Sequence, residues 1–261
     1  MIHLLLSRWR QGRRTMPYPK TLPSLPERFR GRPQFSPGAC PENCRACADA
    51  CPTGAIQLEP GPTLDLGRCL FCTECVDACA GAAPGEVLRF TGDHRLAVRN
   101  REDLVLGPPQ GAEDRPPLAE ALGKELMRVL GRSLKLRVVS AGGCNGCEVD
   151  VNVLGTVAWD LGRFGIQFVA SPRHADGLVI CGPVTANMAL ALRKTYDAVP
   201  DPKIVIAVGA CAIQGGPYLH QAEQLGGAAA AGLPVDLFIP GCPPHPLTIL
   251  DGLLRLLGKI R

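Results

Sequence analysis

The sequence has few aromatic residues and no long apolar segment. Phe, Tyr and Trp together make up 5% of its 261 residues, too few for the stacked aromatic side chains on which single-stranded nucleic acid is usually bound. The net charge of only +4 gives no reason to expect a nucleic-acid partner. No stretch approaches the ~20 consecutive apolar residues of a transmembrane helix, so we expect no segment to span a membrane.

Signals for export and for nucleotide cofactors are also missing. The short apolar stretch at residues 1–7 is followed by Arg8 and Arg10 rather than by a cleavage site, and Arg13-Arg14 is not followed by an apolar segment, as an export signal requires. No Gly-x-Gly-x-x-Gly pattern opens a helix after a strand, which argues against a bound nicotinamide or flavin. We therefore expect a cytoplasmic protein without a dinucleotide site.

Cysteine, in contrast, is abundant. The chain has 13 cysteines, and an odd number excludes a fully paired set of disulfides. In a reducing compartment, cysteines at this density indicate metal binding. Eight of them lie between residues 40 and 79, which makes this segment the first candidate metal site.

The eight cysteines form two similar runs. They read Cys40-x3-Cys44-x2-Cys47-x3-Cys51-Pro52 and Cys69-x2-Cys72-x2-Cys75-x3-Cys79. In two-cluster ferredoxins the first three thiolates of a run bind one [4Fe–4S] cluster and the fourth binds the other. The spacing thus predicts two sites. The first ferredoxin site consists of Cys40, Cys44, Cys47 and Cys79. The second ferredoxin site consists of Cys51, Cys69, Cys72 and Cys75.

Zinc is the alternative metal for these cysteines. Structural zinc usually takes two cysteine pairs separated by a longer loop, which two consecutive runs of this kind do not resemble. Two departures from the ferredoxin pattern remain: the first gap has three residues instead of two, and Ala80 follows Cys79 where many ferredoxins have proline. Neither departure removes a ligand.

This part of the chain resembles the two-[4Fe–4S] ferredoxin-like subunit of complex I and of formate hydrogenlyase. The resemblance covers roughly residues 17–106 and includes Tyr18-Pro19 and the Phe29-Arg30-Gly31-Arg32-Pro33 segment. It implies an α+β ferredoxin-like domain that carries electrons and sits on a membrane arm without spanning it.

From about residue 134, apolar strand-like runs alternate with helical segments. This alternation, with runs rich in Val and Ile, predicts an α/β domain whose parallel sheet is covered on both faces. The expected strands are 134–140, 166–170, 177–181, 203–209 and 235–240, and the expected helices are 118–130, 149–163, 186–199 and 247–260.

Four of the five remaining cysteines follow or end these strands. Cys144, Cys181, Cys211 and Cys242 each lie at or just after the end of an apolar run. The carboxyl ends of parallel strands meet at one edge of a sheet, where ligands gather. Residues that are far apart in the sequence can therefore form one site there.

The motifs around these cysteines strongly resemble the small-subunit family of [NiFe]-hydrogenases and its relative in complex I, the 20 kDa subunit. They are Cys144-Asn-Gly-Cys147, Gly182-Pro-Val-Thr-Ala-Asn-Met188, Gly209-Ala-Cys211-Ala-Ile-Gln-Gly-Gly216 and Pro240-Gly-Cys242-Pro-Pro244. The family implies a flavodoxin-like fold with one [4Fe–4S] cluster, held here by Cys144, Cys147, Cys211 and Cys242. The Cys-x-x-Cys motif is like that of hydrogenases, whereas the complex I member uses two adjacent cysteines. The best resemblance is to membrane-bound hydrogenases of the formate hydrogenlyase type.

These observations predict four segments. We expect a basic N-terminal docking arm at 1–39, a two-[4Fe–4S] ferredoxin-like domain at 40–106, a linker at 107–117 and a hydrogenase small-subunit-like [4Fe–4S] domain at 118–261. Within the arm, Ile2, Leu5, Leu6 and Trp9 share one face of a helix, with arginines beside them. Such a segment is either a short interfacial or docking helix or a frayed terminus.

The predicted function is electron transfer through three [4Fe–4S] clusters in a membrane-associated [NiFe]-hydrogenase complex. The chain has no catalytic residues of its own in this hypothesis, because the hydrogen chemistry takes place on a large subunit. Further expected partners are membrane-arm subunits and an electron donor or acceptor protein, with the chain peripheral on the inner face of the cell membrane. A complex I-like quinone-reducing module is the alternative, and a zinc-stabilised scaffold is a third hypothesis.

Three residues near the C-terminal motifs are not among the predicted ligands. We expect Cys181 to be a small buried apolar residue, since four ligands already saturate a cubane cluster. Glu148 fits a carboxylate that interacts with a helix N-terminus, and the resemblance to the small subunits implies, as the alternative, a glutamate that moves protons near the cluster. His245 is expected in a surface loop, with a hydrogen bond that tunes the nearby cluster as the alternative.

Overall fold

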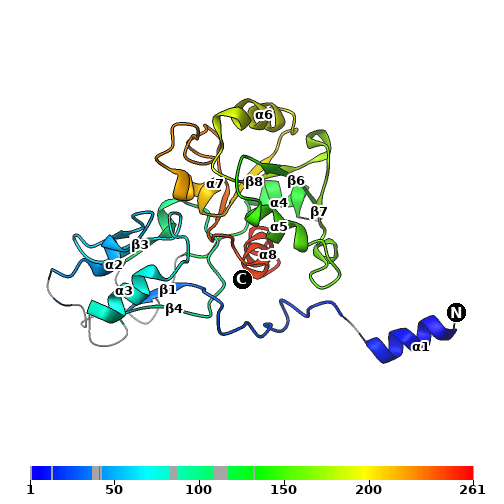
Figure 1. Ribbon diagram of the computed structural model, residues 1–261. Helices are drawn as coiled ribbons and strands as arrows, with labels where there is room; N and C mark the ends of the chain where they lie inside the picture. Colours follow the sequence, from blue (N-terminus) through cyan, green and yellow to red (C-terminus); the bar gives the residue numbers. More distant parts are fainter. Residues whose placement is uncertain are drawn as a thin grey trace.

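The computed structural model describes residues 2–12, 14–36, 41, 43–82, 87–107, 117–131 and 133–260. Cys40 and most of the predicted linker lie outside these residues. The C-terminal part of the chain and the cysteine-rich part lie side by side, and a helix near the N-terminus lies apart from both (Figure 1).

A five-stranded parallel sheet forms the centre of the C-terminal part. Its strands are β6 (Leu134–Ser140), β7 (Ile166–Phe168), β8 (Gly177–Cys181), β9 (Ile204–Val208) and β10 (Leu237–Ile239). The spatial order is β10-β9-β8-β6-β7, which is the 2-1-3-4-5 order of flavodoxin-like folds. Every residue of β8 and β9 is buried, as expected for strands covered on both faces. The predicted α/β fold is thus confirmed.

The sheet separates two apolar layers. Alternate residues of β8 point to opposite faces: Leu178 and Ile180 pack in one layer, Val179 and Cys181 in the other. The helices that accompany the sheet are α4 (Lys124–Leu130), α5 (Gly146–Val153), α6 (Ala186–Asp197), α7 (Ala210–Gln214) and α8 (Pro246–Leu256). Leucines of α8 fill the layer that contains Val179, whereas Leu192 of α6 packs in the layer that contains Ile180.

Two predicted helices are shorter in the structure. The helix expected at 149–163 ends at Val153, where the chain turns through Gly155 before the 3-10 helix η2 (Leu161–Phe164). The helix expected at 118–130 begins only at Lys124, because Ala119 N donates to Ala97 O and Leu122 N to Leu256 O. These long-range hydrogen bonds replace the intrahelical bonds that the leucine spacing suggested. The other 3-10 helices are η1 (Glu102–Leu104), η3 (Pro172–His174) and η4 (Gly216–Tyr218).

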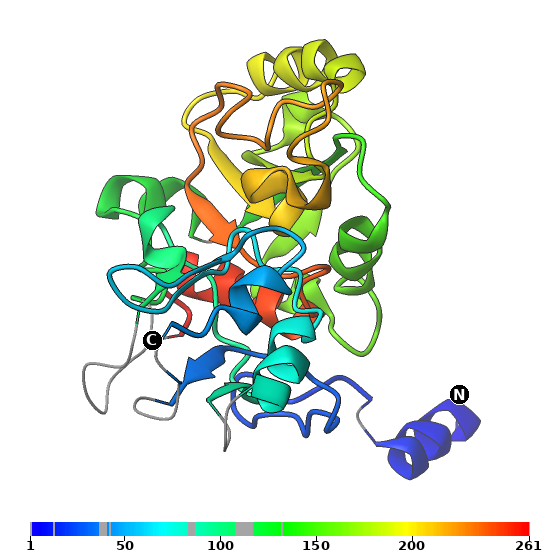
Figure 2. The ribbon, with the colours of Figure 1, turned by 60° about the vertical axis from the view of Figure 1, so that its left-hand side comes forward.

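The cysteine-rich part is a small α+β unit. It contains the antiparallel pair β1 (Pro33–Phe35) and β4 (Leu88–Phe90), the antiparallel sheet of β2 (Ile56–Gln57), β3 (Thr63–Asp65) and β5 (Val105–Leu106), and the helices α2 (Ala46–Asp49) and α3 (Glu74–Ala82). The two helices lie together beside the strands, below the parallel sheet in the view of Figure 2. This arrangement agrees with the predicted ferredoxin-like architecture.

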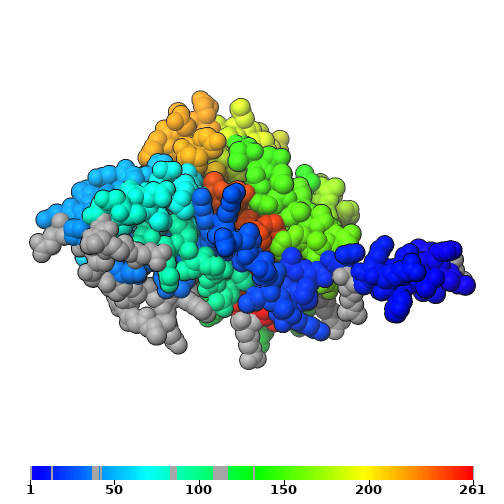
Figure 3. Space-filling view, turned by 60° about the horizontal axis from the view of Figure 1, so that its bottom comes forward, coloured from blue at the N-terminus to red at the C-terminus, as the bar shows by residue number. Residues whose placement is uncertain are grey.

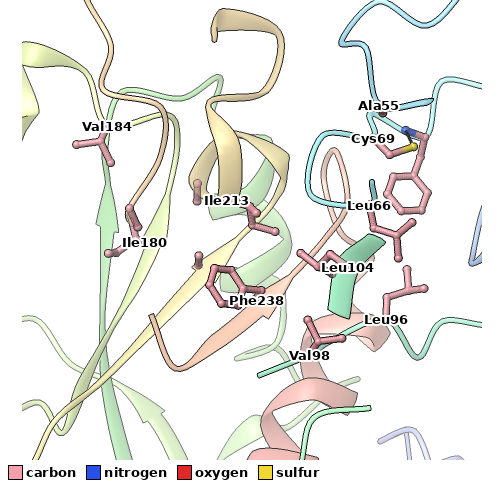
Figure 4. Close-up of a cluster of buried hydrophobic side chains, with 14 of the residues drawn as sticks. Ala55, Leu66, Cys69, Leu96, Val98, Leu104, Ile180, Val184, Ile213 and Phe238 are labelled. Carbon is pink, nitrogen blue, oxygen red and sulfur yellow. Dashed lines mark hydrogen bonds between the residues drawn. The ribbon is translucent and has the colours of Figure 1, made fainter. Parts of the chain in front are cut away.

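One apolar cluster joins the cysteine-rich part to the sheet. Figure 4 shows Leu66, Leu104 and Val98 on one side of this cluster and Ile213 and Phe238 on the other. The backbones of Val98 and Phe238 exchange two hydrogen bonds, of 3.1 and 2.9 Å. The two parts therefore share a core, and their relative position is set by packing rather than by a flexible joint.

Helix α1 (Ile2–Gln11) near the N-terminus makes no such contact. None of its residues is buried, and it projects from the body of the molecule in the space-filling view (Figure 3). The structure thus has a helix in this segment, which is one of the two alternatives that the sequence left open. Among the described residues, no helix has both the length and the apolar character needed to cross a bilayer.

Candidate metal centre

Four cysteines come together at the carboxyl edge of the parallel sheet. Cys144 follows β6, Cys147 lies in the first turn of α5, Cys211 lies in α7 just after β9, and Cys242 follows β10. We call this group the C-terminal cysteine site. Its members come from the ends of three different strands, which the parallel topology places at one edge of the sheet.

Glycines make room for the sulfur atoms of this site. A Cβ atom on Gly216 would lie 2.7 Å from Cys211 Sγ, and one on Gly209 would collide with Cys147 Sγ. Gly209 also has a φ of +89°, a backbone conformation that other residues rarely adopt. The backbone can therefore approach the sulfurs more closely than any side chain would allow, which suits the binding of a bulky group.

Burial disfavours the thiolate form of Cys211 and Cys147. Burial, together with the neighbouring thiols of Cys242 and Cys144, raises the pKa of Cys211 to about 12. Burial also raises the pKa of Cys147, with added contributions from Cys211 and Cys242. Bound metal reverses this preference because its positive charge stabilises thiolates. The set of four sulfur donors, of which Cys211 is buried and Cys144 and Cys242 are exposed, is thus chemically suited to iron.

A buried carboxylate lies next to the C-terminal cysteine site. Glu148 accepts a hydrogen bond of 2.6 Å from Ser140 Oγ and is buried in the first turn of α5, where the helix dipole favours a negative charge. The helix position was predicted from the sequence, whereas Ser140 was not identified as a partner. Cys181 is fully buried, as expected, and burial raises the pKa of its thiol, with Cys147 and Glu148 adding to this effect.

The second ferredoxin site has its four cysteines in one small region. Burial raises the pKa of Cys69 to about 12, and Cys75, Cys51 and Cys72 contribute. Backbone N–H groups point at two of the sulfurs, from Phe71 to Cys69 Sγ at 3.3 Å and from residue 55 to Cys51 Sγ at 3.2 Å. Such N–H···S bonds stabilise cluster thiolates and influence the reduction potential.

The first ferredoxin site is described only in part. Burial raises the pKa of Cys79, and the thiol of Cys44 contributes to this increase, so these two residues from different runs lie near each other. Cys47 is buried on α2, whereas Cys40 is outside the described residues. In the part of the chain that the structure describes, no three His, Cys, Asp or Glu side chains gather at the spacing that a single metal ion requires.

The second ferredoxin site and the C-terminal cysteine site face the same cleft. This cleft has a volume of about 590 Å³, and Cys72 and Cys242 both line it. Burial raises the pKa of Cys242, and Cys144 and then Cys72 add to the increase. Nothing in the motifs indicated that these two cysteines, which are separated by 170 positions in the numbering, would be neighbours.

A segment of the N-terminal arm lies along the cleft. Arg30 Nη1 donates a hydrogen bond of 2.7 Å to Phe71 O, and the ring of Phe29 contacts His245 edge-on at 5.3 Å between centroids. His245 does not lie in a surface loop but caps the N-terminus of α8, where its Nδ1 accepts a hydrogen bond from Leu247 N. The prediction was wrong because proline-rich flanks suggested a loop, whereas Pro246 begins the helix.

Comparison with protein families identifies residues 144–256 with the family model described as the 20 kDa subunit of NADH ubiquinone oxidoreductase. The matched residues include the whole C-terminal cysteine site. A probable membrane-bound hydrogenase subunit, mbhJ, of Pyrococcus furiosus is 41% identical over 136 residues, which cover 52% of this chain and 81% of that protein. An NADH-quinone oxidoreductase subunit of Bacteroides thetaiotaomicron is 43% identical over 116 residues, which cover 44% of this chain and 58% of that protein.

Solved structures give similar matches. A chain of the membrane-bound sulfane sulfur reductase (MBS), an archaeal respiratory membrane complex, is 33% identical with a TM-score of 0.45, over 53% of this chain and 76% of the other. A chain of an NAD⁺-reducing [NiFe]-hydrogenase is 26% identical with a TM-score of 0.40, over 50% of this chain and 94% of the other.

Proposed function

The chain belongs to the family of the 20 kDa subunit of NADH ubiquinone oxidoreductase, and from this premise we propose that it is an electron-transfer subunit of a membrane-associated [NiFe]-hydrogenase complex of the formate hydrogenlyase type. Relatives named as a membrane-bound hydrogenase subunit and as an NADH-quinone oxidoreductase subunit support membership in an oxidoreductase complex. The active site for hydrogen lies on a partner large subunit in this proposal.

The proposed cofactors are three [4Fe–4S] clusters, which accept and donate single electrons. The first ferredoxin site, the second ferredoxin site and the C-terminal cysteine site would each hold one. The chain contributes the thiolates, the backbone N–H groups that point at Cys69 and Cys51, and the glycines that leave room at Cys147 and Cys211. The hydrogen bonds to the sulfurs and the different exposure of the cysteines, from buried Cys69 to exposed Cys242, would tune the potential of each centre.

The observation that carries the proposal is the common cleft of Cys72 and Cys242. A route for electrons between the two parts of the chain requires the second ferredoxin site to be close to the C-terminal cysteine site. The cleft supplies this proximity, and the shared core around Val98 and Phe238 keeps it fixed. Arg30 and Phe29 hold the arm along the same gap.

Substitution of two different cysteines gives the test a matched control. In Cys242→Ala, the C-terminal cysteine site loses one ligand, whereas Cys181→Ala removes a buried thiol at the same edge of the sheet that the proposal leaves unused. Iron and acid-labile sulfide on anaerobically purified protein should give about twelve irons for the parent and for Cys181→Ala, and about eight for Cys242→Ala, at four per cluster. Electron paramagnetic resonance (EPR) of the reduced protein should show that only one centre has disappeared.

The same measurements can refute the proposal. Four or fewer irons in the parent chain, or stoichiometric zinc, would contradict the three clusters. An unchanged set of EPR signals in Cys242→Ala would contradict the ligand assignment.

A complex I-like quinone-reducing module is the second candidate function. It is favoured by the NADH-quinone oxidoreductase relatives, whereas the Cys144-x-x-Cys147 motif resembles that of hydrogenases. The purified complex should take up hydrogen with an artificial acceptor if it is a hydrogenase. Quinone reduction without hydrogen uptake would establish the second candidate instead.

A further inference from the structure

Helix α1 has an apolar stripe with an arginine on each side. At about 100° per residue, Ile2, Leu5, Leu6 and Trp9 fall within an arc of about 100°. Arg8 follows on one side of this arc and Arg10 on the other, while Leu4 and the remaining polar residues lie opposite. A narrow apolar stripe bordered by arginines is typical of helices that lie in the plane of a membrane interface.

The stripe has no partner within the described part of the chain. The side chains of Ile2, Leu5 and Trp9 are 72%, 66% and 82% exposed, and the helix is separate from the body in Figures 1 and 3. Water-exposed apolar residues scattered singly need no explanation, but several on one face of an unpacked helix indicate an interaction surface.

The charge of the arm identifies the chemistry of the partner. Within residues 1–32, eight side chains are basic and one, Glu27, is acidic. Helix α1 itself contains no acidic residue. Anionic lipid headgroups attract such a basic segment, and a tryptophan such as Trp9 prefers the boundary between headgroups and acyl chains.

The arm is anchored to the body only a few residues after α1. Thr15 Oγ1 donates a hydrogen bond of 3.1 Å to Val157 O, and Met16 N donates one of 2.8 Å to Ala158 O. A chain that runs from Gln11 to Thr15 spans about 14 Å at most. Whatever surface α1 binds must therefore pass close to residues 157 and 158, where the side chain of Val157 is itself 74% exposed.

We propose that α1 binds the surface of an anionic lipid bilayer, with Ile2, Leu5, Leu6 and Trp9 in the acyl boundary and the flanking arginines on the headgroups. This inference deepens the proposed function, since it gives the chain its own contact with the membrane of the complex. Trp159 follows the backbone contacts of residues 157 and 158 with the arm. Its ring lies 6.0 Å from the ring of His245, measured between centroids, and His245 lines the cleft together with Cys242. Lipid binding by α1 would thus place the C-terminal cysteine site on the membrane side of the protein.

Two adjacent leucines allow a matched test. Leu5 lies in the stripe and Leu4 lies opposite, with 66% and 75% of their side chains exposed. Leu5→Glu and Leu4→Glu change the charge equally, so any difference between them reports the face of the helix. The full chain is purified anaerobically and sedimented with vesicles of phosphatidylcholine alone, or of phosphatidylcholine with phosphatidylglycerol.

The parent should sediment with the vesicles that contain phosphatidylglycerol and stay in solution with phosphatidylcholine alone at moderate salt. Leu5→Glu should weaken the binding by at least ~10-fold relative to Leu4→Glu, because it removes one large apolar group from the lipid and places a charge there. Trp9 fluorescence should shift to the blue on binding, and Trp9→Phe should bind while losing that shift.

Several outcomes would overturn the inference. One is equal binding to both kinds of vesicle, and another is equal weakening by the two glutamate substitutions. If the parent chain binds no vesicle, and the Leu5→Glu variant fails to retain a subunit of the complex that the parent retains, then α1 docks on a protein. Iron content is measured on the same samples, so failure of the cluster assignment is distinguished from failure of lipid binding.

Discussion

Replacement of Gly216 by alanine should remove one of the three proposed clusters without changing any ligand. Gly216 has a φ of +58°, and a Cβ atom there would lie 2.7 Å from Cys211 Sγ and 3.2 Å from Cys211 Cα. Gly54 has the same φ of +58°, but a Cβ atom there would have no heavy atom within 4 Å. An alanine in this left-handed conformation costs about 1–2 kcal/mol at either position. The two variants therefore share the backbone strain and differ in the contact with the sulfur.

The contact is too short for the sulfur of Cys211 to keep its position. Cys211 lies in α7, which is short and buried. The added methyl group should therefore displace the sulfur of Cys211 from its position. We expect iron per chain to fall from about twelve to about eight in Gly216→Ala, four for each cluster lost, while Gly54→Ala keeps about twelve. The visible absorption and the EPR spectrum of the reduced protein check which centre has disappeared.

Retention of all three EPR signals by Gly216→Ala would refute this reasoning, because it would show that the sulfur of Cys211 need not be where the structure places it. Equal iron loss in both variants would also refute it, since backbone strain alone would then explain the effect.

Three further predictions concern the contacts that hold the parts of the chain together. Asp251→Asn leaves the buried Arg255 without its carboxylate partner at 2.8 Å, and we expect the free energy of unfolding to fall by about 3–5 kcal/mol, measured as an earlier urea transition. Burial raises the pKa of Tyr18, and its hydrogen bond to Asp251 contributes. The unfolded chain therefore loses the phenol proton at a lower pH than the folded chain, and the free energy of unfolding should fall as pH rises above about 10. Tyr18→Phe should reduce this fall when unfolding is measured across alkaline pH. Arg101 joins β3 to α7 through bonds of 2.6 Å to Asp65 and 2.7 Å to Gln214, so Arg101→Ala should accelerate hydrogen–deuterium exchange in both elements, and unchanged exchange would contradict this role.

The sheet could be predicted because its strands carry a local signal. The expected strands 134–140 and 177–181 agree with β6 and β8, since continuous Val- and Ile-rich runs suit a sheet that is covered on both faces. The strand ends then placed Cys144, Cys211 and Cys242 at one edge without further information, because the parallel topology alone brings these ends together.

Helix ends were harder to predict. The spacing of Leu118, Leu122, Leu126 and Leu130 is helical, but the chain over the first part of this spacing is hydrogen-bonded to residues 97 and 256. Local periodicity does not register such distant partners, which can override helix propensity. The same limitation hid the bond between Ser140 and Glu148, whose side chains lie on a strand and on the following helix.

The neighbourhood of Cys72 and Cys242 depends entirely on tertiary packing. Nothing in the spacing of either motif relates one run of cysteines to the other, and the predicted linker suggested independent domains. In the structure the two parts are not independent, because apolar side chains within residues 96–104 pack with Phe238 and Ile213 of the C-terminal part in one cluster. The domain boundaries expected from the sequence remain predictions, because a shared core does not define where one unit stops.

This shared core has a consequence for electron transfer between the proposed centres. In a complex of separate subunits, the gap between two clusters is set by an interface that forms on assembly. Here the gap between the second ferredoxin site and the C-terminal cysteine site is set by the fold of one chain, through the pairing of Val98 with Phe238 and the bonds of Arg101. Because these contacts are buried or partly buried and lie within the chain, they form on folding and do not require a partner subunit. We therefore expect electrons to equilibrate between the two proposed clusters in the isolated chain.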